Sequence, residues 1–371
     1  MSLPVAARSP PPHIRSRKKW TGNRLTNTPF SAFKPYIMDG AAGNFLGFWS
    51  TMVTATFAYL GTELVGVTVG EAQNPRKTIP RAIKLTFFRI LIFYVLSVLL
   101  VGMVVRYDAK ELGFALNAPT GANASPFVVA ITLAGINVLP HILNACILIF
   151  VFSASNSDLY IASRTLYGLA SDGDAPAIFK RTDKRGVPIY ALGFSALFAL
   201  LAFMNVADDS KKVFGYFVNL TTIFGVLTWI SILVAHICFV RARKSQGIPN
   251  SAMPYVAPLG IYGSYAALGF CILIALTKNF DVFVISLKGR FDYETFITGY
   301  IGIPLYLILI FGHKIVTKSK RVTSHDADFY TGKDIIDREE EEFLANQKAK
   351  REASGADNKG WFYRNFVSWL F

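Results

Sequence analysis

Charged residues are scarce in this sequence, and their scarcity narrows the class of protein at once. Only 17% of the 371 residues are charged, whereas 52% are hydrophobic. Soluble domains carry about 25% charged residues, so an ordinary soluble protein is excluded. Apolar stretches of roughly 20 residues, the length that crosses a bilayer as a helix, recur along the chain. We therefore predict an all-α membrane protein surrounded by a lipid bilayer.

The chain also lacks the residue patterns of enzymes and metal centres. Its three cysteines, Cys146, Cys238 and Cys271, all fall inside apolar stretches, so they predict neither a disulfide framework nor a ligand cluster. The five histidines show no ligand spacing, and neither a phosphate-binding loop nor a Ser-His-Asp pattern is present. We expect no enzymatic activity, no metal and no cofactor.

Acidic residues are outnumbered by basic ones, 24 to 38, which gives a net charge of +14. The basic residues lie at the ends of apolar stretches rather than in one patch, so they do not indicate nucleic-acid binding. Basic residues are dense in the connections that follow every second apolar stretch and sparser in the other connections. Dense basic connections are typical of the cytoplasmic side. The dense groups lie at residues 76–84, 180–185, 241–244 and 314–321. This pattern places the C-terminus in the cytoplasm.

The apolar stretches predict seven membrane spans between two polar ends. Residues 1–36 are expected to form a disordered basic leader, residues 37–316 the transmembrane domain, and residues 317–371 a cytoplasmic tail. A short surface helix over 126–135 should precede the third span. The spans are expected near residues 45–69, 85–105, 140–170, 187–206, 213–240, 260–287 and 295–316.

The leader conflicts with an odd number of spans. Seven spans and a cytoplasmic C-terminus put the N-terminus outside, yet the leader is basic and has no apolar signal-peptide core. Its basic residues are Arg8, Arg15, Arg17, Lys18, Lys19, Arg24 and Lys34. Either the chain is a genuine short form with an unusual leader, or it is N-terminally truncated and an odd number of upstream spans is missing. We favour truncation.

Polar residues interrupt the first predicted span at Gly61-Thr62-Glu63. A carboxylate at this depth costs several kcal/mol unless it is paired, protonated or wetted, so Glu63 is a candidate functional residue. Two half-helices meeting here would offer carbonyls to an ammonium group and N–H groups to a carboxylate, as a zwitterionic amino acid requires. The alternative is an unbroken helix with glycine packing and Glu63 hydrogen-bonded to another span.

The third predicted span carries a polar run from Ser153 to Asp158. A helix that faces lipid cannot carry such a run, so this face should point into a bundle or a watery cavity. Asn156 then lines the permeation path and Asp158 serves as a proton or cation site. Alternatively, the hydroxyls and amides hold helices together and Asp158 pairs with a basic neighbour.

Two motifs, Phe57–Gly66 and Glu71–Ala82, resemble the fungal amino-acid permeases of the amino acid–polyamine–organocation superfamily. The resemblance extends from Phe33 to the C-terminus, and the polar run Ser153–Ile161 is most similar to the dicarboxylic (acidic) amino-acid permeases. It implies a leucine-transporter-like fold of twelve spans. The chain would then hold the second inverted repeat plus two C-terminal helices, with five upstream spans absent.

The resemblance also implies an activity, namely secondary active, proton-coupled uptake of glutamate and aspartate across the plasma membrane. The expected substrate-binding residues are Phe57, Ala58, Tyr59, Gly61, Thr62, Glu63 and Asn156, and the proton-coupling candidates are Glu63 and Asp158. Without the first broken helix of the family we expect the chain alone to be inactive. The competing hypothesis is a transport-inactive membrane fragment or regulatory partner. A channel is disfavoured because no selectivity-filter pattern is visible.

Overall fold

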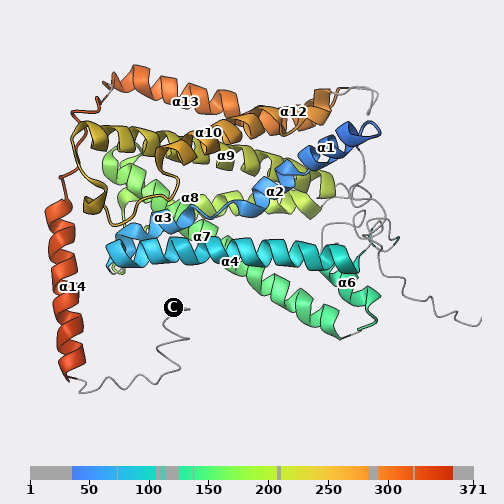
Figure 1. Ribbon diagram of the computed structural model, residues 1–371, viewed down its shortest axis with the longest axis horizontal. Helices are drawn as coiled ribbons and strands as arrows, with labels where there is room; N and C mark the ends of the chain where they lie inside the picture. The colour runs from blue at the N-terminus through green and yellow to red at the C-terminus, as the bar shows by residue number, and fades with distance from the viewer. Residues whose placement is uncertain are drawn as a thin grey trace, which may run out of the picture.

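The computed structural model describes residues 36–72, 74–105, 110, 112, 125–136, 138–206, 210–283, 291–320 and 322–353, and Figure 1 shows their arrangement. Every regular element in these ranges is helical, which confirms the all-α fold. The α-helices, with the 3-10 helices labelled η, are α1 (Ala41–Ser50), α2 (Met52–Tyr59), α3 (Leu64–Val67), η1 (Thr68–Glu71), α4 (Pro75–Val104), α6 (Pro126–Leu133), α7 (Leu139–Asp172), η3 (Ala177–Lys180), α8 (Ile189–Leu197), η4 (Phe198–Val206), α9 (Ser210–Ser245), η5 (Asn250–Ala252), α10 (Gly260–Thr277), η6 (Phe280–Phe283), α12 (Tyr293–Tyr300), α13 (Gly302–Thr317) and α14 (Lys333–Ala353). The predicted basic leader lies outside the described residues.

Five stretches are long and apolar enough to cross a membrane. They are Pro75–Val104, Leu139–Asp172, Lys212–Ser245, Gly260–Phe283 and Tyr293–Thr317. Five of the seven predicted spans thus correspond to stretches long and apolar enough to cross a membrane, although Tyr293–Thr317 combines α12 with α13 and Gly260–Phe283 combines α10 with η6; the other two predicted spans take different forms. Residues 45–69 are divided among α1, α2, α3 and the start of η1. The stretch Ile189–Met204 is apolar but shorter, and combines α8 with the 3-10 helix η4.

Local sequence signals explain several helix boundaries. The helix α4 begins at Pro75, ten residues before the predicted start of the span, because proline at the first helical position has a favourable φ and needs no N–H partner there. Asn74 precedes it in the left-handed conformation, with φ of 50°. At its other end, α7 stops at Gly173, whose φ of 90° is readily adopted only by glycine. The predicted surface helix is present as α6.

The core of the bundle lies where α9 packs against α10 and against α12–α13. Ile223, Val226 and Leu227 of α9 form a buried cluster with Ile274 and Ala275 of α10. Gly302 lets α13 approach α9 closely, since a Cβ there would lie 2.8 Å from Cγ2 of Ile223. The interrupted segment α2–α3 touches α9 through α2 and both α4 and α7 through α3. A rigid helix pair thus supports the segment on one side.

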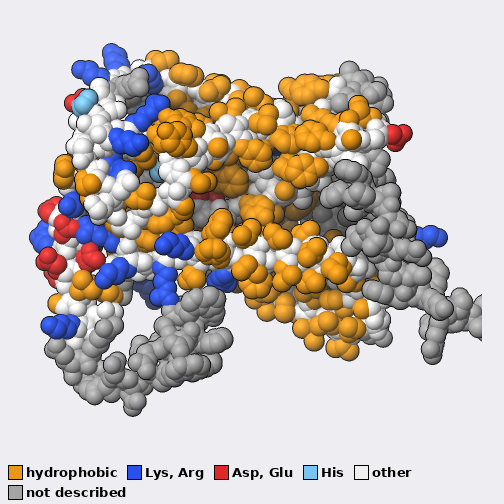
Figure 2. All heavy atoms as spheres, in the orientation of Figure 1, with side chains coloured by type: hydrophobic (Ala, Val, Ile, Leu, Met, Phe, Trp, Pro, Cys, Tyr) orange, Lys and Arg blue, Asp and Glu red, His pale blue; other side chains and the backbone are white. Residues whose placement is uncertain are grey.

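The surface of the bundle is apolar around its middle and basic at one end. No residue in the most apolar window of α4 or α7 is buried, so these helices offer their side chains to lipid or to further helices. Figure 2 shows hydrophobic side chains over the central helices and Lys and Arg side chains gathered near α14. This distribution matches a protein embedded in a bilayer with one basic rim.

The tail helix α14 runs across the basic end of the bundle (Figure 1). Arg76, at the start of α4, forms ion pairs with Asp337 and Glu340 of α14. The connection that precedes α14 is fixed as well, because the Gln246 side-chain amide donates to the carbonyl of Ala327 at 2.7 Å. These contacts tie the tail to the ends of α4 and α9.

A compact turn precedes α14 and is organised by Asp328. Its carboxylate accepts hydrogen bonds from the Thr331 hydroxyl and from the backbone N–H groups of Tyr330 and Thr331. These donors stabilise the ionised form and lower the pKa of Asp328 to about 2. The turn therefore keeps its negative charge throughout the physiological pH range.

Candidate functional site

The first apolar stretch is interrupted at the position that the sequence predicts. The helix α2 ends at Tyr59, Leu60 is extended with ψ of 146°, and α3 begins at Leu64. Gly61 adopts φ of 94°, a conformation that side-chain-bearing residues rarely adopt. The alternative of an unbroken helix is therefore wrong, and the backbone leaves the helical path over four residues.

The Glu63 carboxylate is held by two donors. Its Oε2 accepts the backbone N–H of Gly61 at 3.1 Å and the indole Nε1–H of Trp229, on α9, at 3.0 Å. Glu63 is half-buried, and these bonds offset part of the cost of placing a carboxylate inside an apolar bundle. One part of the rejected alternative is thus present, because Glu63 does bond to another span.

A second contact with α9 fixes the other side of the interruption. The side chain of Leu60 fills the space that a Cβ at Gly225 would occupy, so a larger residue there would force the end of the Leu60 side chain to shift. Gly225 and Trp229 are four residues apart and lie on the same face of α9. This face therefore positions both Leu60 and Glu63, and the interruption is built against a rigid helix.

Several backbone groups that the sequence analysis offered to substrate are already bonded within the protein. The Gly61 N–H donates to Glu63, and the Leu64 N–H donates to the Gly61 carbonyl at 3.2 Å. The Ala58 carbonyl accepts the hydroxyl of Tyr94, on α4, at 2.9 Å. A carbonyl has two lone pairs, so the Ala58 and Gly61 oxygens each keep one further acceptor site. The Gly61 and Leu64 N–H groups are therefore already used within the protein, whereas the Ala58 and Gly61 carbonyls can each accept one more hydrogen bond.

A cavity of about 440 Å³ opens between the interruption and α7. Its volume lies in the range of small-molecule sites, roughly 300–1,000 Å³. The cavity brings Gly61 and Asn156 together, although they are far apart in the sequence. The lining residues are Gly61, Leu64, Val65, Thr68, Asn156, Ser157, Tyr160 and Ile161. The predicted meeting of the interruption with the polar run of α7 is present.

The polar run of α7 divides into bonded and available groups. Ser155 and Ser157 donate to the carbonyls of Val151 and Ser153, four residues back, at 2.9 and 3.0 Å. The side chain of Asn156 makes no hydrogen bond within the described part of the chain, and Asn156 is one of the residues that line the cavity. Asn156 is therefore the polar side chain of this run that is best placed to meet a ligand.

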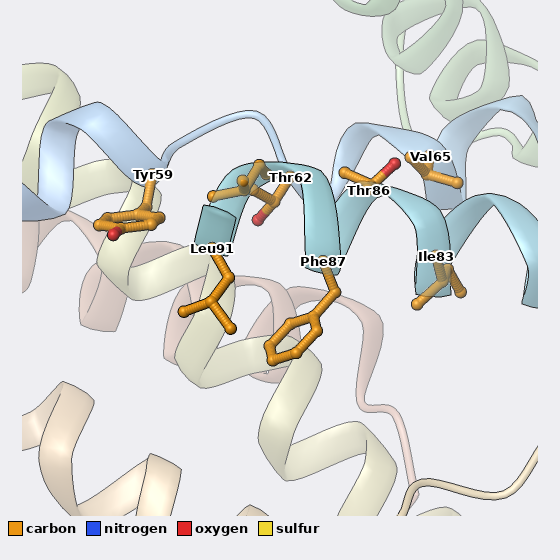
Figure 3. A pocket seen from close by; sticks show the side chains of 8 residues that line it. Tyr59, Thr62, Val65, Ile83, Thr86, Phe87 and Leu91 are labelled. Atoms are coloured by element: carbon orange, nitrogen blue, oxygen red, sulfur yellow. The ribbon is translucent and has the colours of Figure 1, made fainter. Parts of the chain in front are cut away.

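A separate groove of about 350 Å³ lies between the interrupted segment and α4. Figure 3 shows Tyr59 and Thr62 beside Phe87 and Leu91 of α4. The groove is largely apolar, so these predicted site residues do not share the cavity of Asn156. Four further predicted site residues line neither this groove nor the cavity of Asn156, namely Phe57, Ala58, Glu63 and Asp158.

Charged groups lie close to the cavity of Asn156. The guanidinium carbon of Arg164 lies 5.5 Å from the ring centre of Tyr160, which is one of the residues lining the cavity. Asp158 is exposed and interacts electrostatically with Glu63. Sequence reasoning could not find Trp229, Tyr94 or Gly225, because no local pattern distinguishes them from packing residues.

Comparison with known proteins gives a consistent family. Residues 10–326 match the model of the family described as amino acid permease. The chain is 52% identical to a dicarboxylic amino acid permease of Saccharomyces cerevisiae, over 92% of the chain and 56% of that protein. It is 46% identical to an uncharacterized amino-acid permease of Schizosaccharomyces pombe, over 80% of the chain and 56% of that protein. A proline-specific permease of Emericella nidulans is 39% identical over 83% of the chain and 56% of its own length.

Two features of these matches bear on the sequence analysis. The family match begins at residue 10, so the expectation that the resemblance starts at Phe33 is wrong. The chain spans about half the length of the curated relatives it matches. No solved structure matches the chain significantly. These relatives are named as permeases, that is, as membrane transporters rather than enzymes.

Proposed function

Because the chain belongs to the amino acid permease family, we propose that it takes part in proton-coupled uptake of acidic amino acids across the plasma membrane. The family and the apolar helices make it an integral membrane protein. The acidic substrate is suggested by the 52% identity to a dicarboxylic amino acid permease over most of the chain. The end of the bundle that carries α14 should face the cytoplasm, because Lys and Arg residues are concentrated there and cytoplasmic connections are typically basic.

The observation that carries this proposal is the cavity between the interrupted helix and α7. The free acceptor site on the Gly61 carbonyl suits the ammonium group of an amino acid, and the Asn156 amide suits its α-carboxylate. An acidic substrate has a second carboxylate, for which Arg164, beside the lining residue Tyr160, supplies a positive charge. Phe57, Tyr59 and Thr62 then act on substrate only if the segment moves during transport.

Glu63 and Asp158 are the proposed proton sites. Glu63 lies in the interruption and Asp158 on the polar run of α7, and the two carboxylates interact electrostatically. Protonation of Glu63 would weaken its bonds to Gly61 and Trp229, since bonds to a neutral acceptor are weaker than bonds to a charged one. A proton would thereby loosen the interruption from α9, which links proton binding to opening of the site.

Uptake of radiolabelled glutamate tests the proposal. The 371-residue chain is expressed alone, and also joined to the remainder of the Saccharomyces cerevisiae relative that the match does not cover, in yeast cells without acidic amino-acid uptake. We expect saturable uptake that increases with external acidity from the joined protein and none from the chain alone. Equal uptake of neutral amino acids would overturn the acidic substrate. Absence of uptake from a joined protein at the plasma membrane would favour the inactive-fragment hypothesis.

Variants of the joined protein test the cavity itself. Asn156→Leu should raise the KM for glutamate about tenfold or more, because a bound carboxylate would lose its hydrogen-bond donor. Ser155→Ala is the matched control, since its hydroxyl is bonded within its own helix and should leave KM within about twofold. Glu63→Gln should lower the transport rate severely. Unchanged kinetics in Asn156→Leu would place the substrate elsewhere.

A further inference from the structure

A larger cavity lies away from the interruption, at the basic end of the bundle. It has a volume of about 630 Å³ and is enclosed by the end of α9, the connection over residues 246–259 and the start of α10. Most of its wall is apolar. The wall includes Ile232, Phe239, Val256, Leu259, Ile261 and Tyr262.

Arg243 places a buried positive charge in this cavity. It lies in the last turn of α9 and is only 5% exposed. Its Nε and one terminal nitrogen, Nη1, are buried and have no hydrogen-bond partner. Lys244 lines the same cavity, and no Asp or Glu is among its lining residues in the described part of the chain. An unpaired buried charge costs several kcal/mol, so an anion bound in this cavity would stabilise the arrangement.

The neighbouring Arg241 shows that burial of Arg243 is specific. Arg241 is exposed, and its guanidinium carbon lies 5.7 Å from the ring centre of Tyr265. The two arginines are close in sequence on the same helix end, yet only Arg243 lines the cavity. Asn250 and Tyr255 are further polar residues of the lining, as are His236 and Ser264, which hydrogen-bond to one another at 2.8 Å.

We propose that this cavity binds the phosphate-bearing headgroup of an anionic membrane lipid, with Arg243 as the main ligand. A guanidinium group binds phosphate through two parallel hydrogen bonds, and because Nε and Nη1 of Arg243 are buried, the side chain must turn toward the cavity to form them. The apolar wall is suited to the first carbons of the acyl chains, which a free phosphate ion would leave unoccupied. The site lies at the end that we place in the cytoplasm, where membranes carry anionic lipids. This inference does not depend on the transported substrate.

Lipid titration of the purified 371-residue chain, followed by native mass spectrometry, tests the proposal. Phosphatidylserine and phosphatidylcholine with identical acyl chains are compared, each with and without inorganic phosphate. We expect the chain to bind phosphatidylserine about tenfold more tightly than phosphatidylcholine. Arg243 and Lys244 should each contribute a factor of about five or less to this affinity ratio. Inorganic phosphate at equal concentration should not displace the lipid. Because both lipids carry the phosphate group, equal affinity for them would refute the proposed selectivity for an anionic headgroup, and full displacement by phosphate would refute a lipid in favour of a free ion.

Variants assign the preference to the cavity. Arg243→Gln should reduce the preference for phosphatidylserine to less than about twofold, whereas Arg241→Gln removes the same charge from an exposed position and should keep most of it. Circular dichroism checks that each variant is folded. If Arg243→Gln does not fold, Arg243→Lys retains the charge without the planar fork and should lose about half of the preference. Equal preferences in the wild type, Arg243→Lys and Arg241→Gln would show that the lipid binds elsewhere.

Discussion

The bond between Trp229 and Glu63 makes a specific prediction about the interrupted helix. In Trp229→Phe the ring stays apolar and aromatic, but the indole N–H that lies 3.0 Å from the Glu63 carboxylate is lost. The backbone N–H of Gly61 then remains as the donor to that carboxylate. We expect the segment from Leu60 to Leu64 to open locally more often, since its bond to the rigid helix α9 is gone.

The size of the effect follows from the type of bond. A hydrogen bond to a charged group contributes about 1.5–3 kcal/mol, and a lost partner leaves the carboxylate underpaired in an apolar setting. Because about 1.4 kcal/mol is a factor of ten in an equilibrium constant, the amides of the interruption should exchange about tenfold to hundredfold faster. Amides in the core around Ile223 should keep their exchange rates.

Hydrogen exchange with mass spectrometry is the assay, on the purified chain in lipid nanodiscs, for the peptide covering residues 57–68. Trp49→Phe is the matched control. Its indole Nε1–H donates to the neutral hydroxyl of Thr277 at 3.0 Å, joining α1 to α10 rather than to the interruption. It loses the same volume and the same donor but should leave residues 57–68 unchanged. Equal protection of this peptide in Trp229→Phe and the wild type would refute the proposed role of the bond.

Two further contacts give predictions of the same kind. Gly225→Ala should lower the melting temperature, because the added methyl group overlaps Leu60 and overpacking costs about 1–3 kcal/mol. This cost exceeds the helix propensity that alanine gains over glycine. Gly215→Ala is the control and should not lower the melting temperature, because the space around Gly215 is open. Arg76→Gln should release α14 and increase its cleavage by proteinase K about twofold to thirtyfold, since it removes two surface ion pairs that contribute about 0.2–1 kcal/mol each. Arg81→Gln, on the same helix, is the control, and equal cleavage of both variants would show that other contacts hold the tail.

Local sequence signals were sufficient for the positions of most helices. Long apolar runs predicted the five stretches that are long and apolar enough to cross a membrane, because a bilayer requires about 20 apolar residues in a helix whatever the tertiary fold. Proline and glycine signals explain ends such as Pro75 and Gly173. The stretch over 187–206 shows where this reasoning fails. Apolarity does not distinguish an α-helix from the 3-10 helix η4, whose rise of about 2.0 Å per residue lets fewer residues cover the same depth.

The site was predicted only in part, because its key contacts join residues that are distant in sequence. A glycine and a carboxylate inside an apolar run indicated the interruption, and the polar run of α7 indicated Asn156. Trp229 lies 166 residues from Glu63, and nothing in its own surroundings marks it as a donor to a carboxylate. Gly225 likewise looks like an ordinary small residue in an apolar helix until Leu60 is placed against it.

The two interpretations of Glu63 that the sequence left open turn out to describe one arrangement. An interrupted helix and a carboxylate bonded to another span were treated as alternatives, yet the same oxygen closes the turn at Gly61 and accepts the indole of Trp229. An interruption in an apolar bundle leaves backbone groups unpaired, and a nearby carboxylate is one way to satisfy them. The carboxylate therefore stabilises the interruption while its charge remains. Removal of the Glu63 charge, as in Glu63→Gln, would therefore weaken both bonds together, because both end on the same carboxylate oxygen.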